Sequence, residues 1–204
     1  MIVDKLYHRS VFYVVGEFVN SEGESSRHPI GTAFCVQQLT AGITAHHYCV
    51  TARHVIEGEG GGSDPINLFI RIGVADGFED IAIRKEDWIC HPETDIAVCI
   101  APPRLHEYFS HGVFDRAFAE AGQDVFFIGL FSGAPGEHSV DAIVRFGRVC
   151  RERTKIQIPL GASHEIKELD AFLIEAHPWP GASGSPVFRD DNFAAVAQTL
   201  RAES

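Results

Sequence analysis

Three short stretches of this 204-residue sequence contain side chains that together can carry out acyl transfer. They read VTARHV at residues 50–55, HPETDIAV at residues 91–98 and PGASGSPVF at residues 180–188. Each stretch offers one side chain of a suitable chemical type, namely His54, Asp95 and Ser183. A nucleophile, a base and a group that orients the base are what a nucleophilic hydrolase needs at one site.

The three side chains have complementary roles in such a reaction. A serine hydroxyl is a weak nucleophile at neutral pH, so a neighbouring base must take its proton during attack. Histidine titrates near neutrality, and His54 could accept that proton and return it to a leaving amine. A buried carboxylate such as Asp95 would fix the imidazole tautomer and stabilise the imidazolium that forms. We therefore expect a catalytic triad of His54, Asp95 and Ser183.

The glycines beside Ser183 indicate a second feature of such a site. Gly181 has no Cβ, so the chain can turn sharply there and direct the amides of Gly181 and Ser183 at one point. A tetrahedral oxyanion would lie at that point, and the loss of one such donor typically slows a hydrolase about 100- to 1000-fold. We expect these two amides to form an oxyanion hole.

The elements that must position these residues are mostly short strands. Apolar, β-rich runs alternate with turn residues along most of the chain, which favours a sandwich or a barrel. An exposed loop is expected over residues 20–29, and helices only near 52–56 and 114–121. The charged segment 102–122 is the best place for a boundary between two lobes. Among the expected strands are residues 30–39, 46–51, 140–149, 156–160 and 171–176.

The motifs resemble those of the trypsin and chymotrypsin superfamily of serine proteases. VTARHV is similar to the family's histidine motif, TDIAV to its aspartate motif and GASGSPVF to its serine motif, in the family's order His, Asp, Ser. The stretch GTAF at residues 31–34 resembles the strand before the histidine, and residues 123–149 resemble the second barrel of compact, HtrA-like bacterial-type members. The resemblance extends over residues 11–200 and includes no PDZ domain.

The resemblance implies an all-β fold of two antiparallel β-barrels of the chymotrypsin-like double-barrel type, with the active site between them. It implies one peptidase domain over residues 1–204, with a first lobe at about 10–101, a connecting segment at about 102–122 and a second lobe at about 123–204. After Ser183, family members normally continue with an edge strand that pairs with the substrate, and only residues 184–204 follow here. We expect that the chain is truncated, that this edge is short, or that a further domain or a partner chain completes it.

Three positions depart from the family's pattern. Ala182 replaces an acid that pairs with a newly freed N-terminus in trypsin-like zymogens, so that activation switch is expected to be absent. Ser185 replaces the second glycine of the serine motif. His177, followed closely by Trp179, occupies the place where family members often set side-chain preference. The resemblance implies a specificity pocket there that favours apolar or small side chains over Arg or Lys.

Composition argues against several other classes of protein. The formal net charge of −11 at pH 7 argues against a nucleic-acid partner. No stretch approaches the roughly 20 apolar residues of a membrane-spanning helix, and the first residues lack a signal-peptide pattern, so we expect a cytoplasmic protein without a membrane partner. Five cysteines without a CxxC pair predict buried free thiols. His46 and His47 fall on opposite faces of a strand, which argues against a metal site, and no metal or organic cofactor is expected.

The sequence therefore predicts a serine endopeptidase that hydrolyses a polypeptide substrate through an acyl-enzyme. Two alternatives stay open. One is a catalytically silent module with a protease fold, which binds its partner without turnover. The other is an esterase-like hydrolase that uses the same triad on small acyl substrates.

Overall fold

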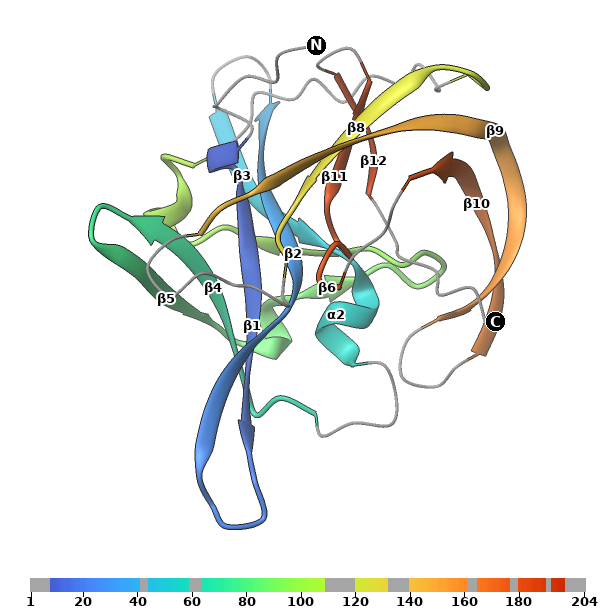
Figure 1. Cartoon of the computed structure of the whole chain (residues 1–204). Coiled ribbons are helices and arrows are strands. Elements are labelled where there is room, and N and C mark those ends of the chain that lie inside the picture. The colour runs from blue at the N-terminus through green and yellow to red at the C-terminus, as the bar shows by residue number, and fades with distance from the viewer. Residues whose placement is uncertain are drawn as a thin grey trace.

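The chain folds into two antiparallel β-sheets, as a computed structural model shows (Figure 1). The sheets confirm the all-β class that the sequence predicts, and the helix expected near residues 52–56 is α2 (Arg53–Glu57). The helix expected near 114–121 lies almost entirely outside the residues that the structure describes. The described residues are 8–40, 44–58, 64–108, 120–131, 140–160, 165–176, 180–189 and 192–196.

The first sheet has seven strands in the order β5-β4-β1-β2-β3-β7-β6. A single turn of 3-10 helix follows β5 at Lys85–Asp87, and another follows β7 at Pro103–Leu105. The strands are β1 (Val11–Val19), β2 (Ser25–Thr40), β3 (Thr44–Thr51), β4 (Asn67–Val74), β5 (Gly77–Ile83), β6 (Ile89–Cys90) and β7 (Ala97–Ile100).

The second sheet has five strands in the order β10-β9-β8-β11-β12. Its longest pair, β9 with β10, forms a curved hairpin at one side of the molecule (Figure 1). The strands are β8 (Asp124–Gly129), β9 (Ile143–Leu160), β10 (Glu165–Glu175), β11 (Pro186–Arg189) and β12 (Asn192–Val196).

Strand β1 is apolar on both faces because it lies between two hydrophobic cores. Successive side chains of a strand point to opposite faces, so a strand buried on both sides has an unbroken apolar sequence. Phe12 and Val14 face the core of the first sheet, whereas Val11, Tyr13 and Val15 face a second core. We call the latter the interface core, because side chains of the second sheet complete it.

The interface core joins the two sheets. The ring of Phe126 in β8 stacks on that of Phe188 in β11, with centroids 5.1 Å apart. The hydroxyl of Tyr13 donates a hydrogen bond to the carbonyl oxygen of Phe131 at 3.0 Å, which links β1 to the end of β8. The buried residues of the interface core are Val11, Tyr13, Val15, Phe34, Val36, Val50 and Phe69 from the first sheet, with Phe126, Ile128, Leu130 and Phe188 from the second.

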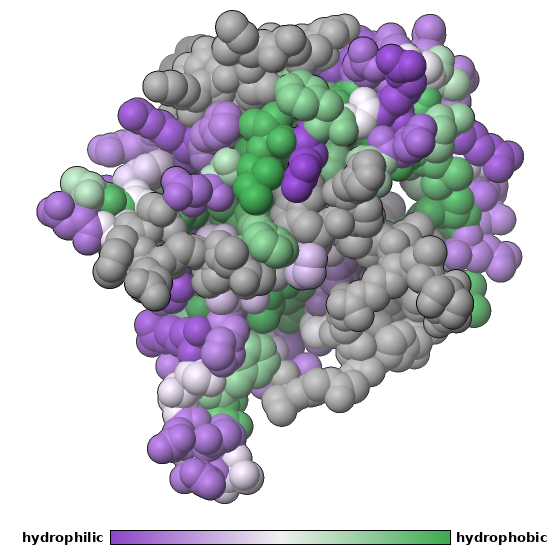
Figure 2. Space-filling model, in the orientation of Figure 1, coloured by the Kyte–Doolittle hydropathy of each residue, from purple (hydrophilic) through white to green (hydrophobic). Residues whose placement is uncertain are grey.

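The predicted loop over residues 20–29 is wrong in its second half. Strand β2 begins at Ser25 and pairs with β1, so the two strands form a hairpin that extends from the body of the molecule (Figure 1). Pro29 lies opposite Val15, where the register shifts, and a shift of this kind tolerates a residue without an N–H donor. Figure 2 shows the tip of the hairpin covered by hydrophilic residues, which made the sequence read as a loop.

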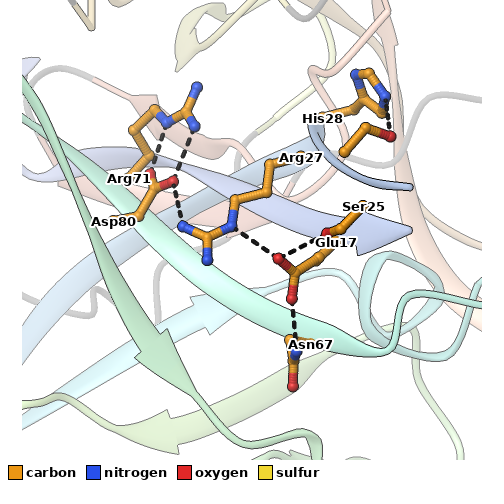
Figure 3. Close-up of polar contacts among 8 residues, drawn as sticks. Glu17, Ser25, Arg27, His28, Asn67, Arg71 and Asp80 are labelled. Atoms are coloured by element: carbon orange, nitrogen blue, oxygen red, sulfur yellow. Dashed lines mark hydrogen bonds and ion pairs between the residues drawn. The ribbon is translucent and has the colours of Figure 1, made fainter. Parts of the chain in front are cut away.

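A network of charged groups holds the base of this hairpin to β4 and β5 (Figure 3). Arg71 donates two hydrogen bonds to Asp80, at 2.7 and 2.9 Å, in the paired geometry that suits a guanidinium and a carboxylate. Arg27 contacts both Glu17, at 3.2 Å, and Asp80, at 3.4 Å. Asn67 of β4 also donates to Glu17 at 2.6 Å. The network connects strands β1, β2, β4 and β5, and the guanidinium of Arg27 also lies 3.8 Å from the centre of the Phe69 ring in the interface core.

The strands expected over 140–149 and 156–160 form one continuous strand, β9 (Ile143–Leu160). The charged segment between them, RERTK at 151–155, suggested a break. Its backbone instead pairs with β10, and Lys155 reaches Glu168 across the hairpin at 2.5 Å. Exposure of this part of the hairpin explains the charged sequence, because a solvated strand needs no apolar side chains.

Candidate active site

His54 lies in α2, directly after strand β3. Ala52 still has an extended backbone, with φ −76° and ψ 142°, so the chain turns from strand to helix within two residues. Val55 and Ile56 are buried and fix the helix against the core of the first sheet. Gly31 of β2 lies so close beneath that a Cβ there would be 2.6 Å from Val55 Cγ1. The position of His54 is therefore set by packing beneath it.

Asp95 and His54 form a hydrogen-bonded pair. One carboxylate oxygen, Oδ1, accepts from the backbone N–H of His54 at 2.9 Å, and the other, Oδ2, lies 2.7 Å from His54 Nδ1. The side chain of Asp95 is only 5% exposed and that of His54 13%. Because a buried carboxylate accepts and does not donate, the Nδ1 proton points at Asp95 and Nε2 is the nitrogen left to accept another proton.

The loop that holds Asp95 is fastened from both sheets. The backbone N–H of His91 donates to the carbonyl oxygen of Ile96 at 2.8 Å and closes the loop. Arg53, beside His54, donates to the carbonyl of His91 at 3.2 Å. Lys167, on β10 of the second sheet, donates to the carbonyl of Pro92 at 3.0 Å. The β9–β10 hairpin therefore contacts the first sheet next to the aspartate.

Ser183 lies in a tight turn that leads into β11. The turn closes with a 3.0 Å hydrogen bond from the N–H of Ser185 to the carbonyl of Ala182. Gly181 and Gly184 have φ angles of +91° and +88°, a left-handed conformation that residues with a Cβ rarely adopt. The sequence reasoning from Gly181 to a sharp turn agrees with this backbone.

The serine turn packs against the chain just before His54. A Cβ added at Gly184 would collide with the carbonyl oxygen of Thr32 and the hydroxyl of Thr51, and would lie 3.1 Å from the backbone nitrogen of Ala52. The N–H of Thr32 donates to the carbonyl of Ser183 at 2.9 Å. The turn that contains Ser183 therefore packs against the residues directly before α2, the helix that contains His54.

Two of the departures from the family's pattern have structural explanations. Ala182 is buried in the core of the second sheet with Val125 and Phe127, an apolar environment in which an acid would need a charged partner. Ser185 is fully buried, so its side chain fits within the packed turn without reaching solvent. The candidate pocket residues His177 and Trp179 lie outside the described residues, as do residues 197–204, and their roles stay predictions.

Sequence reasoning missed two threonines that hold the turn. Thr32 and Thr51 are fully buried polar residues, and the hydroxyl of Thr51 donates to the carbonyl of Thr32 at 2.7 Å. The motif GTAF, which includes Thr32, was the available signal, but it indicated only a strand.

Metal ligands and thiols add little to this site. In the described part of the chain, no group of three or more His, Cys, Asp or Glu side chains is arranged to hold a metal ion. Cys35, Cys49 and Cys99 are buried free thiols as predicted, whereas Cys150 is exposed and contradicts that prediction. None of the described helices is long and apolar enough to cross a membrane.

Comparison with known proteins identifies the fold. The family model of the trypsin-like peptidase domain matches residues 31–197. No curated protein sequence matches the chain. The active form of the Rv3671c protease from M. tuberculosis is similar in structure, with a TM-score of 0.62 and 19% sequence identity over 94% of this chain and 70% of that one.

Two further solved structures agree. The MamO protease domain from Magnetospirillum magneticum has a TM-score of 0.62 at 17% identity, covering 94% of this chain and 84% of that one. Deg5 has a TM-score of 0.61 at 18% identity, covering 94% of this chain and 81% of that one. At such low identities the likeness establishes the fold, so the two sheets form the expected double-barrel fold.

Proposed function

The chain belongs to the trypsin-like peptidase domain family, and from this premise we propose that it is a serine endopeptidase acting through an acyl-enzyme. The observation that carries the proposal is the His54–Asp95 pair, in which one buried carboxylate accepts from both the backbone and the ring of the histidine. That arrangement holds the imidazole in the tautomer whose Nε2 can act as a base.

In the proposed reaction, Ser183 Oγ attacks the carbonyl carbon of a peptide bond while His54 Nε2 takes the hydroxyl proton. The amides of Gly181 and Ser183 stabilise the resulting oxyanion. His54 then gives its proton to the leaving amine, the C–N bond breaks, and an ester remains on Ser183. Water, deprotonated by His54, hydrolyses that ester and restores the serine. The scheme assigns no step to a metal or cofactor.

We also propose that this machinery acts without cleavage of the chain. In a trypsin-like zymogen an acid before the serine pairs with a freed N-terminus, and Ala182 cannot form that ion pair. Packing of Ala182 into the core of the second sheet would serve the same purpose, because it fixes the residue before Ser183. A cytoplasmic location is proposed as well, supported by the five unpaired thiols.

The first test is covalent labelling with a fluorophosphonate probe, which reacts with an activated serine. Wild type should label, and Ser183→Ala should abolish labelling. Ser185→Ala is the matched control, since this buried serine lies two residues along the same turn and should not be the labelled group. A wild-type protein that fails to label would favour the silent binding module. Hydrolysis of p-nitrophenyl esters without cleavage of any peptide library would favour the esterase.

The second test removes the charge of the aspartate. Asp95→Asn should slow labelling about 10⁴-fold, as expected where an aspartate fixes the tautomer of a catalytic histidine. Asp80→Asn is the matched control, because Asp80 also binds a side-chain nitrogen, that of Arg71, but in the charged network at the base of the β1–β2 hairpin. Equal labelling rates in the two variants would contradict the role given to Asp95.

A further inference from the structure

Thr32 on β2 contacts both halves of the candidate site through every polar atom that it has. Its N–H donates to the carbonyl of Ser183 at 2.9 Å, and its carbonyl accepts from the hydroxyl of Thr51 at 2.7 Å. Its hydroxyl is 2.6 Å from the carbonyl oxygen of Gly181 and 3.2 Å from the backbone nitrogen of Leu130. Thr32 is fully buried, so water does not compete for these partners.

The direction of the hydroxyl's two hydrogen bonds is fixed by its partners. The N–H of Leu130 can only donate, and the carbonyl of Gly181 can only accept. The single proton of the Thr32 hydroxyl must therefore point at Gly181, while a lone pair of the same oxygen receives the N–H of Leu130. The hydroxyl of Thr32 therefore links the end of β8 to the serine turn through two hydrogen bonds.

These contacts fix the peptide planes around the two proposed oxyanion donors. The carbonyls of Gly181 and Ser183 are held by Thr32, and the carbonyl between them, that of Ala182, is held by the N–H of Ser185. The peptide unit is planar, so anchoring the Ala182 carbonyl also sets the direction of the Ser183 N–H. The Gly181 N–H is separated from the anchored plane after Gly181 only by the φ and ψ of this residue, and its φ is +91°.

We propose that Thr32 is a positioning residue of the oxyanion hole, and that its hydroxyl keeps the Gly181–Ser183 turn in the conformation that aims both amides at the developing oxyanion. The inference rests on the proposed function. Thr32 belongs to the first sheet and the turn to the second, so the residue also sets the turn relative to His54, which follows Thr51 by three positions.

The test compares two variants that differ in the hydroxyl. Thr32→Val keeps the shape and removes the hydrogen bonds, whereas Thr32→Ser keeps the hydroxyl. The rate of fluorophosphonate labelling should fall about 10- to 100-fold in Thr32→Val, less than the loss expected when a donor itself is removed. Thr32→Ser should stay within about threefold of wild type. Thr154→Val, the same change on β9 opposite Ala171, should leave the rate unchanged.

The pH profile separates a positioning role from general damage to the site. The His54–Asp95 hydrogen bonds do not involve Thr32, so the midpoint of the labelling rate against pH should be the same in Thr32→Val and wild type. The rate of the acylation burst with p-nitrophenyl acetate should fall in parallel with labelling. A shifted midpoint would mean that the substitution acts through His54, which would overturn the inference.

A further pair covers the case in which Thr32→Val does not fold, as thermal unfolding would reveal. Thr32→Ser and Thr32→Cys have similar volumes, but a thiol is a weak donor. The cysteine variant should label at least about fivefold more slowly than the serine variant. If both label at the wild-type rate, the inference about Thr32 is wrong and the proposed protease remains. If wild type itself does not label, the proposed function fails and the inference falls with it.

Discussion

The two sheets contribute to the candidate site in different ways. The first supplies side chains, His54 and Asp95, which bind each other directly. The second supplies a backbone turn around Ser183, and two carbonyl groups of this turn, those of Gly181 and Ser183, accept hydrogen bonds from Thr32 of the first sheet. The base and the carboxylate that binds it therefore both come from the first sheet, whereas the geometry of the nucleophile depends on contact between the two sheets.

The hydrophobic cores of the two sheets also differ, because the core of the first sheet is large and that of the second is small. In the described residues, the core of the first sheet has buried residues from six of its seven strands, with Cys90 of β6 packed against it, and includes the buried helix residues Val55 and Ile56. The core of the second sheet is small, and one of its buried residues is Ala182, which belongs to the serine turn itself. A turn with so little apolar support of its own must be stabilised by its neighbours, and the hydrogen bonds from Thr32 of the first sheet provide such support.

The largest effect is expected at Gly184, where the serine turn contacts the first sheet, because a substitution there disrupts this contact directly. Gly184→Ala places a Cβ against the carbonyl of Thr32 and the hydroxyl of Thr51, on a backbone with φ +88°. We expect fluorophosphonate labelling to slow at least about 100-fold, since the oxyanion donors move, and the free energy of unfolding to fall by about 2–4 kcal/mol. Urea unfolding and labelling kinetics measure the two effects.

Gly122→Ala is the control for backbone strain alone. Its φ is +90°, almost the same, but nothing lies within 4 Å of the added Cβ. It should cost roughly 1–2 kcal/mol of stability and leave labelling unchanged. Similar losses of labelling in both glycine variants would show that contact with the first sheet does not hold the serine turn.

The thiols offer a second comparison of the two sheets. Hydrogen bonding of the protonated Cys49 thiol to the sulfur atoms of Cys35 and Cys99, together with burial, raises the pKa of Cys49 well above its usual range. The reactive thiolate of Cys49 is therefore scarce, and Cys35 and Cys99 are buried beside it, whereas Cys150 on β9 is exposed. Native protein should react with a disulfide reagent such as DTNB at one fast thiol, with the buried three at least about 100-fold slower because they require local unfolding.

The variant that tests this assignment is Cys150→Ser, which should remove the fast phase and no other. Cys90 is half-buried, and burial raises its pKa, so it should react at an intermediate rate. A fast phase that persists in Cys150→Ser, or that accounts for three thiols, would mean that the first core opens more readily than the second sheet.

The side chains of the candidate site could be proposed from the sequence because their chemistry is local, and the structure brings together one predicted pair, His54 and Asp95. His54, Asp95 and Ser183 each occur in a short motif whose neighbours suggest a strand, a turn or a helix start. Residue types alone indicated that Gly181 had to turn sharply, and its φ of +91° agrees. Burial of Cys150 was wrongly predicted because cysteine is usually buried, while its strand lies in an exposed hairpin.

The supporting contacts were not predictable, because they join segments distant in the chain. The hydroxyl of Thr32 and the carbonyl of Gly181 are 149 positions apart. Nothing near Thr32 in sequence shows that its side chain meets a second sheet. The continuity of β9 through residues 151–155 was missed for a related reason, since only pairing with β10 keeps this charged segment extended.

The smallest expected effect is a dependence of the free energy of unfolding on pH that comes from a histidine of the first sheet. His47 on β3 stacks on His106, with ring centroids 4.4 Å apart, and its Nε2 accepts from the side-chain amide of Gln37 at 3.3 Å. Burial, followed by the positive charges that His106 and His46 can carry, lowers the pKa of His47. In the described residues the second sheet has no histidine, so this sensitivity belongs to the first sheet.

The sign follows from the lowered pKa. As pH falls through about 6.5, the usual value for histidine, the unfolded chain takes up a proton at residue 47 before the folded protein does, so acid reduces stability. The loss continues down to the folded pKa and is complete below it. His47→Gln removes this titration, so its free energy of unfolding in urea should fall less than that of wild type between pH 7.5 and pH 5. The same fall in both proteins would show that the His47–His106 stack does not disfavour the protonated ring.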